Sequence, residues 1–128
     1  MDDVSKRDEE TKLVIELGKS FMQQMSQVEP NWNKAYFRFV AQDIGNGCNA
    51  SYVHGSEVEL LDLRENESFV DEMMEQSNRL AELSGKKKFV MLLSVNSDAN
   101  YKFHFDYEDL ERWKITKQDG RTGIPAGM

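Results

Sequence analysis

The stretch Lys34-Ala35-Tyr36-Phe37-Arg38-Phe39-Val40-Ala41-Gln42 is where the apolar pattern of the chain changes from a helical period to a period of two. One side of this stretch mixes Tyr36 and Val40 with a charged residue, Arg38. The other side is uniformly apolar and consists of Ala35, Phe37, Phe39 and Ala41. Because successive side chains of a strand point to opposite faces, the pattern predicts a β-strand whose uniformly apolar side faces the core.

The residues before this stretch predict a helix that ends at Pro30. Apolar side chains recur on one helical face, at Leu13, Leu17, Phe21 and Met25. Pro30 ends the pattern because the residue before a proline is pushed out of the helical conformation. Gly18 lies inside the pattern, where glycine costs about 1 kcal/mol relative to alanine. We therefore expect a close packing contact at Gly18.

The residues after it predict two more strands. Residues 43–47 are rich in turn-forming residues, and short strands are expected at 48–53 and 58–63, separated by His54-Gly55-Ser56. Strands joined by such tight turns pair antiparallel, so residues 34–63 are expected to form a three-stranded meander.

A second helix is expected between residues 68 and 85. Ser68 followed by Asp71 is typical of a capping box, and Gly85 is suited to the left-handed residue after the last turn. One stripe along this helix consists of Phe69, Met73, Gln76, Leu80 and Leu83. Its opposite face is acidic.

Two strands are expected to follow this helix. Residues 89–95 form a continuous apolar run, typical of a strand buried on both faces, and residues 101–107 alternate aromatic with polar side chains. Residues 108–113 are expected to form a short turn of helix, and the Gly-rich end at 120–128 is expected to be a frayed tail.

The whole chain is therefore expected to be one α+β domain spanning residues 1–128, with an ordered core at about 11–113. About five strands, mainly antiparallel, would pack on two helices as a two-layer sandwich in the order α-β-β-β-α-β-β.

Charge is concentrated in the middle of the chain. The protein has 128 residues and a net charge of −7, yet residues 43–82 contain ten acidic residues against Arg64 and Arg79. Such a surface repels nucleic acid and attracts a basic protein, although acidity also serves simple solubility. A single cysteine, no apolar run of about 20 residues and an acidic N-terminus without signal-peptide pattern predict a cytoplasmic protein that does not bind membranes.

No constellation of catalytic or metal-binding residues stands out. Cys48, His54 and His104 are too few for a structural zinc site, so we expect no metal and no cofactor. Cys48 alternates with polar residues on a strand, which is typical of a small core residue. A small enzyme using either histidine with carboxylates remains the catalytic alternative. Trp32 and Trp113 are either interface anchors or caps on the ends of the core.

Two segments carry a resemblance to a known family. In Pro30–Phe37 a helix passes through a Pro-x-Trp-like junction into an aromatic strand, and in Lys102–Leu110 a strand ends in an aromatic and acidic run. With the acidic helix and long apolar strand between them, residues 11–112 resemble the YezG-like immunity proteins of bacterial polymorphic and contact-dependent toxin systems. The resemblance implies an α+β protein that binds and neutralises a cognate toxin domain, often a nuclease, in the cytoplasm of the producing cell.

The expected function is therefore stoichiometric inhibition of a toxin, with no catalysis by this chain. The toxin-binding candidates are the acids at the end of the third strand and the start of the second helix, followed by three residues elsewhere. They are Asp62, Glu65, Glu67, Asp71, Glu72 and Glu75, with Trp32, His104 and Asp106 behind them. The alternative is a non-catalytic binding module or a chaperone for a secreted effector.

Overall fold

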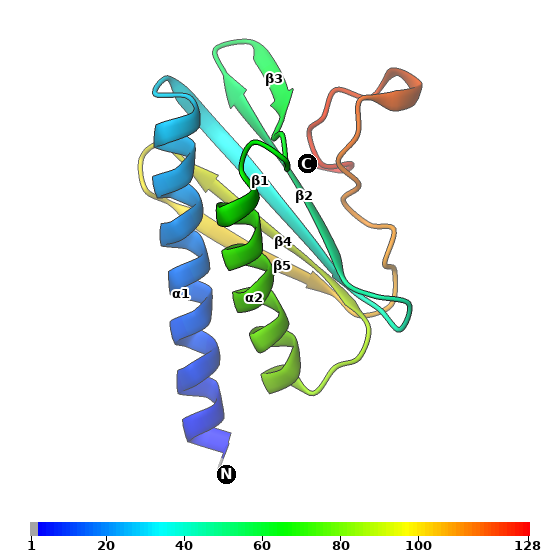
Figure 1. Ribbon diagram of the computed structural model, residues 1–128. Helices are drawn as coiled ribbons and strands as arrows, with labels where there is room; N and C mark the ends of the chain where they lie inside the picture. The colour runs from blue at the N-terminus through cyan, green and yellow to red at the C-terminus, as the bar shows by residue number, and fades with distance from the viewer. Residues whose placement is uncertain (1–2) are drawn as a thin grey trace.

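A computed structural model describes residues 3–128 of the protein, with side chains from residue 7 onward. Two helices and five strands follow one another in the predicted order (Figure 1). The elements are α1 (Asp3–Val28), β1 (Trp32–Ala41), β2 (Gly47–His54), β3 (Glu57–Leu60), α2 (Glu67–Ser84), β4 (Phe89–Asn96), β5 (Tyr101–Asp106) and a short 3₁₀ helix, η1 (Gln118–Gly120). Among these described residues, no helix is both long and apolar enough to cross a membrane.

The five strands form one antiparallel sheet in the order β3-β2-β1-β4-β5. β1 lies at its centre, where Phe37 is opposite Ala50 of β2 and Leu93 of β4. Both helices lie side by side on one face of the sheet (Figure 1). The predicted α+β class and element order are therefore confirmed.

The main core lies between the helices and the sheet. Phe21 of α1 lies at its centre, with its ring centroid 6.0 Å from that of Phe37 and 6.1 Å from that of Phe69 of α2. The apolar side of β1, predicted from its alternation, is buried throughout against the helices. In β4, Phe89 to Leu93 and Val95 are all buried, which confirms the strand covered on both faces.

The start of α2 differs from its prediction. The helix begins at Glu67, and the residue before it, Asn66, makes no capping hydrogen bond with its side chain, so the predicted capping box at Ser68 is wrong. The Asn66 amide is used elsewhere: it donates to the carbonyl oxygen of Asp62 at 2.7 Å and accepts from Gln24 of α1 at 2.8 Å. These bonds fix the loop before α2 against α1. The left-handed end at Gly85 (φ 71°) is confirmed.

The third strand is shorter than predicted. β3 ends at Leu60, whereas the alternation indicated a strand as far as residue 63. Leu61 is buried, and its N–H donates to the carbonyl oxygen of Ala50 at 2.9 Å. The chain therefore turns into the core at this point instead of continuing along the edge of the sheet.

The C-terminal segment (residues 107–128) is the largest departure from the predicted fold. Its last part, residues 120–128, was expected to fray, but the segment lies along the sheet face opposite the helices (Figure 1). Trp113 and Ile115 are each 5% exposed and form a second cluster with the outer side chains of the sheet, Tyr36, Val90 and Leu92. Without this cover, those apolar side chains would face water, so their burial stabilises the segment. Residues 110–113 form a turn in place of the predicted helical turn.

Arg38 ties this segment to the centre of the sheet. Its guanidinium donates to the carbonyl oxygens of Arg112 at 2.9 Å (Nε) and of Leu110 at 2.6 Å (Nη2). Asn49 of β2 adds a third bond, from Nδ2 to the carbonyl oxygen of Ile115 at 3.0 Å. Burial lowers the pKa of Arg38, and the nearby carboxylates Glu111 and Asp109 act in the opposite direction.

Gly18 makes the close contact that its place in the helix predicts. A Cβ atom at this position would lie 3.4 Å from the Tyr101 ring, at the near limit of ordinary van der Waals contact. We expect Gly18→Ala to raise the free energy of unfolding by about 0.5 kcal/mol, because alanine gains helix propensity and still fits. Gly18→Val, which is larger and β-branched, is expected to destabilise. Urea denaturation of both variants measures this, and a destabilised Gly18→Ala would show that the ring cannot adjust.

Candidate protein-binding surface

An acidic groove lies on the outer surface of the helix layer. It has a volume of about 700 Å³ and is lined by Leu13 of α1 and by Asp71, Glu72, Met74, Glu75, Gln76, Asn78, Arg79 and Glu82 of α2. Asp71, Glu72 and Glu75 are exposed, because the helical period places them opposite the buried stripe of α2. Leu13 and Met74 are half-buried, so the groove offers apolar surface beside its carboxylates.

The charge of the groove is only partly neutralised. Arg79 donates to Glu9 of α1 at 2.8 Å and lies 3.6 Å from Glu82, and its pKa is raised chiefly by the hydrogen bond to Glu9. Among the described side chains, no cation lies within 4.0 Å of the carboxylates of Asp71, Glu72 or Glu75. Three predicted candidates therefore lie together in one groove with their charge uncompensated.

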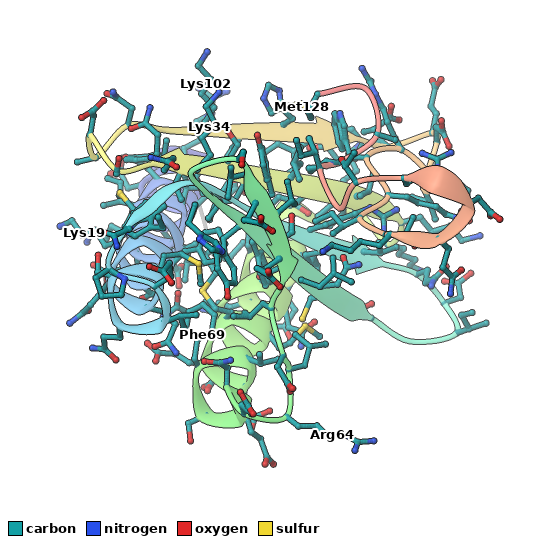
Figure 2. The ribbon with its side chains drawn as sticks, turned by 90° about the horizontal axis from the view of Figure 1, so that it is seen from above. Lys19, Lys34, Arg64, Phe69, Lys102 and Met128 are labelled. Carbon is teal, nitrogen blue, oxygen red and sulfur yellow. The ribbon has the colours of Figure 1, made fainter. Side chains whose placement is uncertain are left out.

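The other three predicted acids lie at the N-terminal end of α2. Asp62 has a local role, since its Oδ1 accepts from the N–H groups of Arg64 at 2.9 Å and Glu65 at 3.1 Å. Glu65 and Glu67 are exposed. Arg64, the cation in this stretch, projects away from the molecule (Figure 2). These acids extend the negative surface beyond the groove without lining it.

Both tryptophans belong to the core. Trp32 is 6% exposed, and its Nε1 donates to the Ser26 hydroxyl at 3.2 Å. Trp113 is buried under the C-terminal segment on the other face of the sheet. The interpretation that they cap the core is thus confirmed, and Trp32 does not present its indole on the surface.

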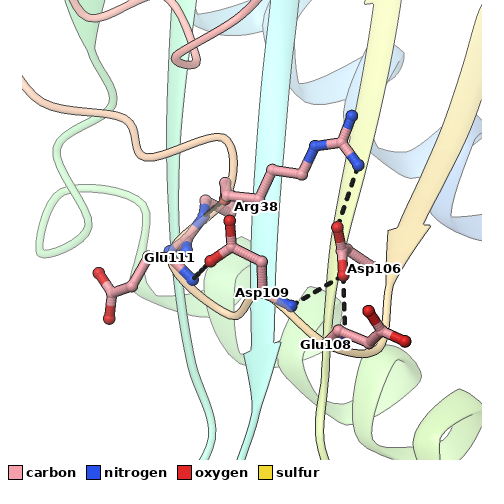
Figure 3. A network of polar contacts seen from close by, with 6 residues as sticks. Arg38, Asp106, Glu108, Asp109 and Glu111 are labelled. Carbon is pink, nitrogen blue, oxygen red and sulfur yellow. Dashed lines mark hydrogen bonds and ion pairs between the residues drawn. The ribbon is translucent and has the colours of Figure 1, made fainter.

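His104 and Asp106 lie on β5, on the sheet face opposite the helices. His104 is half-buried, with its ring centroid 5.8 Å from that of Trp113. Oδ1 of Asp106 accepts from the N–H groups of Asp109 and Glu108, both at 2.9 Å, and Oδ2 pairs with Arg112 at 3.0 Å (Figure 3). Both residues are therefore remote from the acidic groove, and Asp106 holds the turn that begins the C-terminal segment.

Because of this network, the stability of the fold should vary with pH in the acid range. The N–H groups of Asp109 and Glu108, together with Arg112, lower the pKa of Asp106 from 3.8 to about 2. Because the pKa of Asp106 is lower in the folded protein than in the unfolded chain, its ionised carboxylate stabilises the fold at pH values above 3.8. This contribution is lost as the pH falls from 3.8 towards 2. We expect Asp106→Asn to be less stable than wild type at neutral pH and to lose less stability over that acid range. Urea denaturation at several pH values measures both, and parallel pH profiles would contradict the assignment.

The candidate catalytic and metal-binding side chains lie on two strands, with Cys48 and His54 on β2 and His104 on β5. The described residues contain no group of three or more His, Cys, Asp and Glu side chains placed to hold a metal ion. Burial raises the pKa of Cys48 to about 11, which disfavours its reactive thiolate. His54 lies 4.0 Å from Glu59, on a strand separated from that of His104 by β1 and β4. The two histidines therefore do not share one site.

Sequence reasoning missed the apolar part of the groove and its charge balance. Leu13 was assigned to the core stripe of α1 and Met74 was not singled out, yet both line the groove. Arg79 pairs with Glu9, which lies 70 positions away in the chain, and no local sequence pattern predicts such a contact.

Comparison of the chain with models of known protein families finds no match, and neither does its comparison with curated proteins. The resemblance to YezG-like immunity proteins therefore stays a prediction. Function has to be inferred from the surface itself.

Proposed function

We propose that this protein is a non-catalytic binding protein whose acidic groove docks on a basic surface of another protein. The observation that carries the proposal is the cluster of Asp71, Glu72 and Glu75, exposed and unpaired among the described side chains, beside Leu13 and Met74. Apolar area surrounded by charge is the usual composition of a protein interface. Carboxylates without cations of their own remain available to the partner's lysines and arginines.

In its specific form, the proposal is that the chain is an immunity protein that neutralises a cognate bacterial toxin domain, a nuclease, in the cytoplasm. A nuclease must hold a phosphate backbone, so the surface around its active site is basic. An acidic groove competes for such a surface and excludes the nucleic acid by occupying it. The resemblance of residues 11–112 to immunity proteins supports this form, and so does the acidity of residues 43–82.

Binding of this kind is steered by charge. The ten acids of residues 43–82 raise the rate of encounter with a basic partner, because opposite fields attract before contact. At physiological salt the Debye length is about 8 Å, so added salt weakens this steering. The association rate should therefore fall with rising salt more steeply than the dissociation rate changes.

The test is coexpression with the toxin encoded beside the gene for this protein. Cells that make the toxin alone should stop growing, cells that make both proteins should grow, and the two should copurify in a 1:1 complex. Titration of the purified toxin with this protein should then abolish the toxin's nuclease activity when one equivalent of this protein has been added. Equal killing with and without this protein, with no complex recovered, would exclude the immunity function. A neighbour that does not kill but fails to be exported without this protein would identify the chaperone alternative instead.

A further inference from the structure

β5 is an open edge of the sheet. Among the described residues it pairs only with β4, so one side of its backbone has free N–H and C=O groups. The opposite edge, β3, is protected: it has four residues, two of them glutamates, and Gly123 of the C-terminal segment lies against Val58. β5 is longer, with six residues, and its two charged residues, Lys102 and Asp106, have opposite signs.

The direction of the backbone groups of β5 follows from its hairpin with β4. The N–H of Asn96 donates to the carbonyl oxygen of Asn100 at 2.9 Å, so residue 100 points its backbone groups towards β4. Because this direction alternates along a strand, residues 102, 104 and 106 also face β4. Residues 101, 103 and 105 therefore direct their N–H and C=O groups to the free edge.

The side chains beside this edge are aromatic on one face and charged on the other. Tyr101, Phe105 and Tyr107 are 38%, 36% and 49% exposed. Phe105 stacks on Tyr107, with centroids 6.3 Å apart. On the other face, Lys102 and Asp106 lie at equal distances along the strand from His104, with opposite charges.

We propose that a second copy of this chain occupies this edge, with the two β5 strands antiparallel about a two-fold axis at His104. In that register Lys102 lies opposite Asp106 of the second copy, and the contact occurs twice by symmetry. The Asp106 carboxylate already pairs with Arg112 of its own chain at 3.0 Å, so Lys102 joins that pair as a second cation. On the aromatic face, Tyr101 lies opposite Tyr107 and Phe103 opposite Phe105. Cross-strand ion pairs and aromatic pairs are the contacts that stabilise antiparallel sheets.

The charges select this register over its neighbours. If the register shifts by one residue, each residue whose backbone groups face the free edge lies opposite a residue of the second copy whose backbone groups face β4. The hydrogen bonds between the two β5 strands then cannot form. A shift of two residues places either Lys102 or Asp106 opposite His104, and a shift of four places like charges opposite each other. Only the register centred on His104 satisfies both charges and all four aromatic rings.

The resulting dimer joins two five-stranded sheets into one, with the helices of both copies on the same face. The acidic groove is formed by α1 and α2 and contains no residue of β5, so each copy keeps its own groove. The dimer would thus be bivalent, and its existence does not depend on the function proposed above.

The first test measures the oligomeric state by sedimentation velocity over a series of protein concentrations. Wild type is expected to form a reversible dimer, and Lys102→Glu to weaken it about tenfold or more, because two like-charge pairs replace two ion pairs. Lys34→Glu is the matched control, since Lys34 lies beside Lys102 on the same sheet face but on β1 (Figure 2). It should dimerise like wild type. A wild type that stays monomeric at its highest soluble concentration overturns the proposal, and so does equal weakening by both variants.

The second test fixes the register by crosslinking. On a Cys48→Ser background, His104→Cys should give a disulfide-linked dimer under mild oxidation, because residues on the axis form a non-hydrogen-bonded pair with Cα atoms about 4.5 Å apart. Tyr101→Cys, whose counterpart is residue 107, should not crosslink. Equal crosslinking of both variants, or of neither, overturns this register. If the chain stays monomeric and β5 instead pairs with a strand of another protein, the proposed pairing of two copies is overturned.

Discussion

Replacing Trp113 by alanine is expected to lower the free energy of unfolding by about 3–5 kcal/mol, the usual cost of removing a large buried aromatic side chain. Trp113 packs on Tyr36, Val90 and Leu92, and the Arg112 guanidinium lies 4.6 Å from the centre of its ring. Its loss would leave a cavity under the C-terminal segment and expose the outer face of the sheet. Urea denaturation followed by circular dichroism measures the effect.

Two further variants separate packing from backbone strain at this position. Trp113 has a positive φ of 60°, which is unfavourable for a residue with a side chain. Trp113→Gly should therefore be more stable than Trp113→Ala by about 1 kcal/mol, although it removes more side chain. Trp113→Phe should retain most of the packing. If Trp113→Ala costs less than about 1 kcal/mol, the C-terminal segment contributes little to the fold and the outer cluster is misassigned.

Neutralising the acidic groove is expected to weaken binding to the cognate toxin about 100-fold. The variant combines Asp71→Asn, Glu72→Gln and Glu75→Gln, which keep the shape of each side chain and remove its charge. A pair of opposite charges 4 Å apart is worth about 1 kcal/mol even in water, so three such pairs account for a loss of this size. Surface plasmon resonance at several salt concentrations measures the effect, which should lie mainly in the association rate at low salt.

The control removes the same net charge elsewhere. Glu57→Gln, Glu59→Gln and Glu108→Gln together change three surface acids outside the groove. This variant should bind nearly as tightly as wild type. Equal weakening by both triple variants would show that overall charge, and not the groove, attracts the partner. Full affinity in both would show that the toxin binds another surface.

The elements with a strong period could be predicted from the sequence. The alternation through Phe37 and Phe39 identified β1 as a strand and the side of it that faces the core. Its place at the centre of the sheet was not predicted. The continuous run in β4 indicated burial on both faces. These patterns can be recognised in the sequence because the residues on the buried face of one helix or strand recur at a fixed, short spacing.

The cover on the outer face could not be predicted in this way. Arg38 made its side of β1 look exposed, yet the partners of its guanidinium are carbonyl oxygens 72 and 74 positions later in the chain. Glycines and polar residues made residues 120–128 look mobile, although Gly123 and Pro125 are buried. A segment without regular structure has no period, so the packing of its few apolar residues is visible only in three dimensions.

The candidate site was predicted in part. Helical spacing was enough to bring Asp71, Glu72 and Glu75 to one exposed surface of α2. The separate roles of Asp62 and Asp106 were hidden, because their partners are backbone N–H groups in turns that composition does not specify. A count of acids therefore located the region but could not distinguish free carboxylates from those that hold the chain in place.

Arg38 fastens the C-terminal segment through main-chain oxygens, which every amino acid possesses. The anchor is therefore indifferent to which side chains occupy positions 110 and 112. A substitution at position 110 therefore leaves the anchor intact, whereas the arginine cannot be exchanged even for lysine, which lacks the forked geometry that reaches two acceptors. At position 112 the side chain has a separate task, because Arg112 pairs with Asp106 and lies over the Trp113 ring.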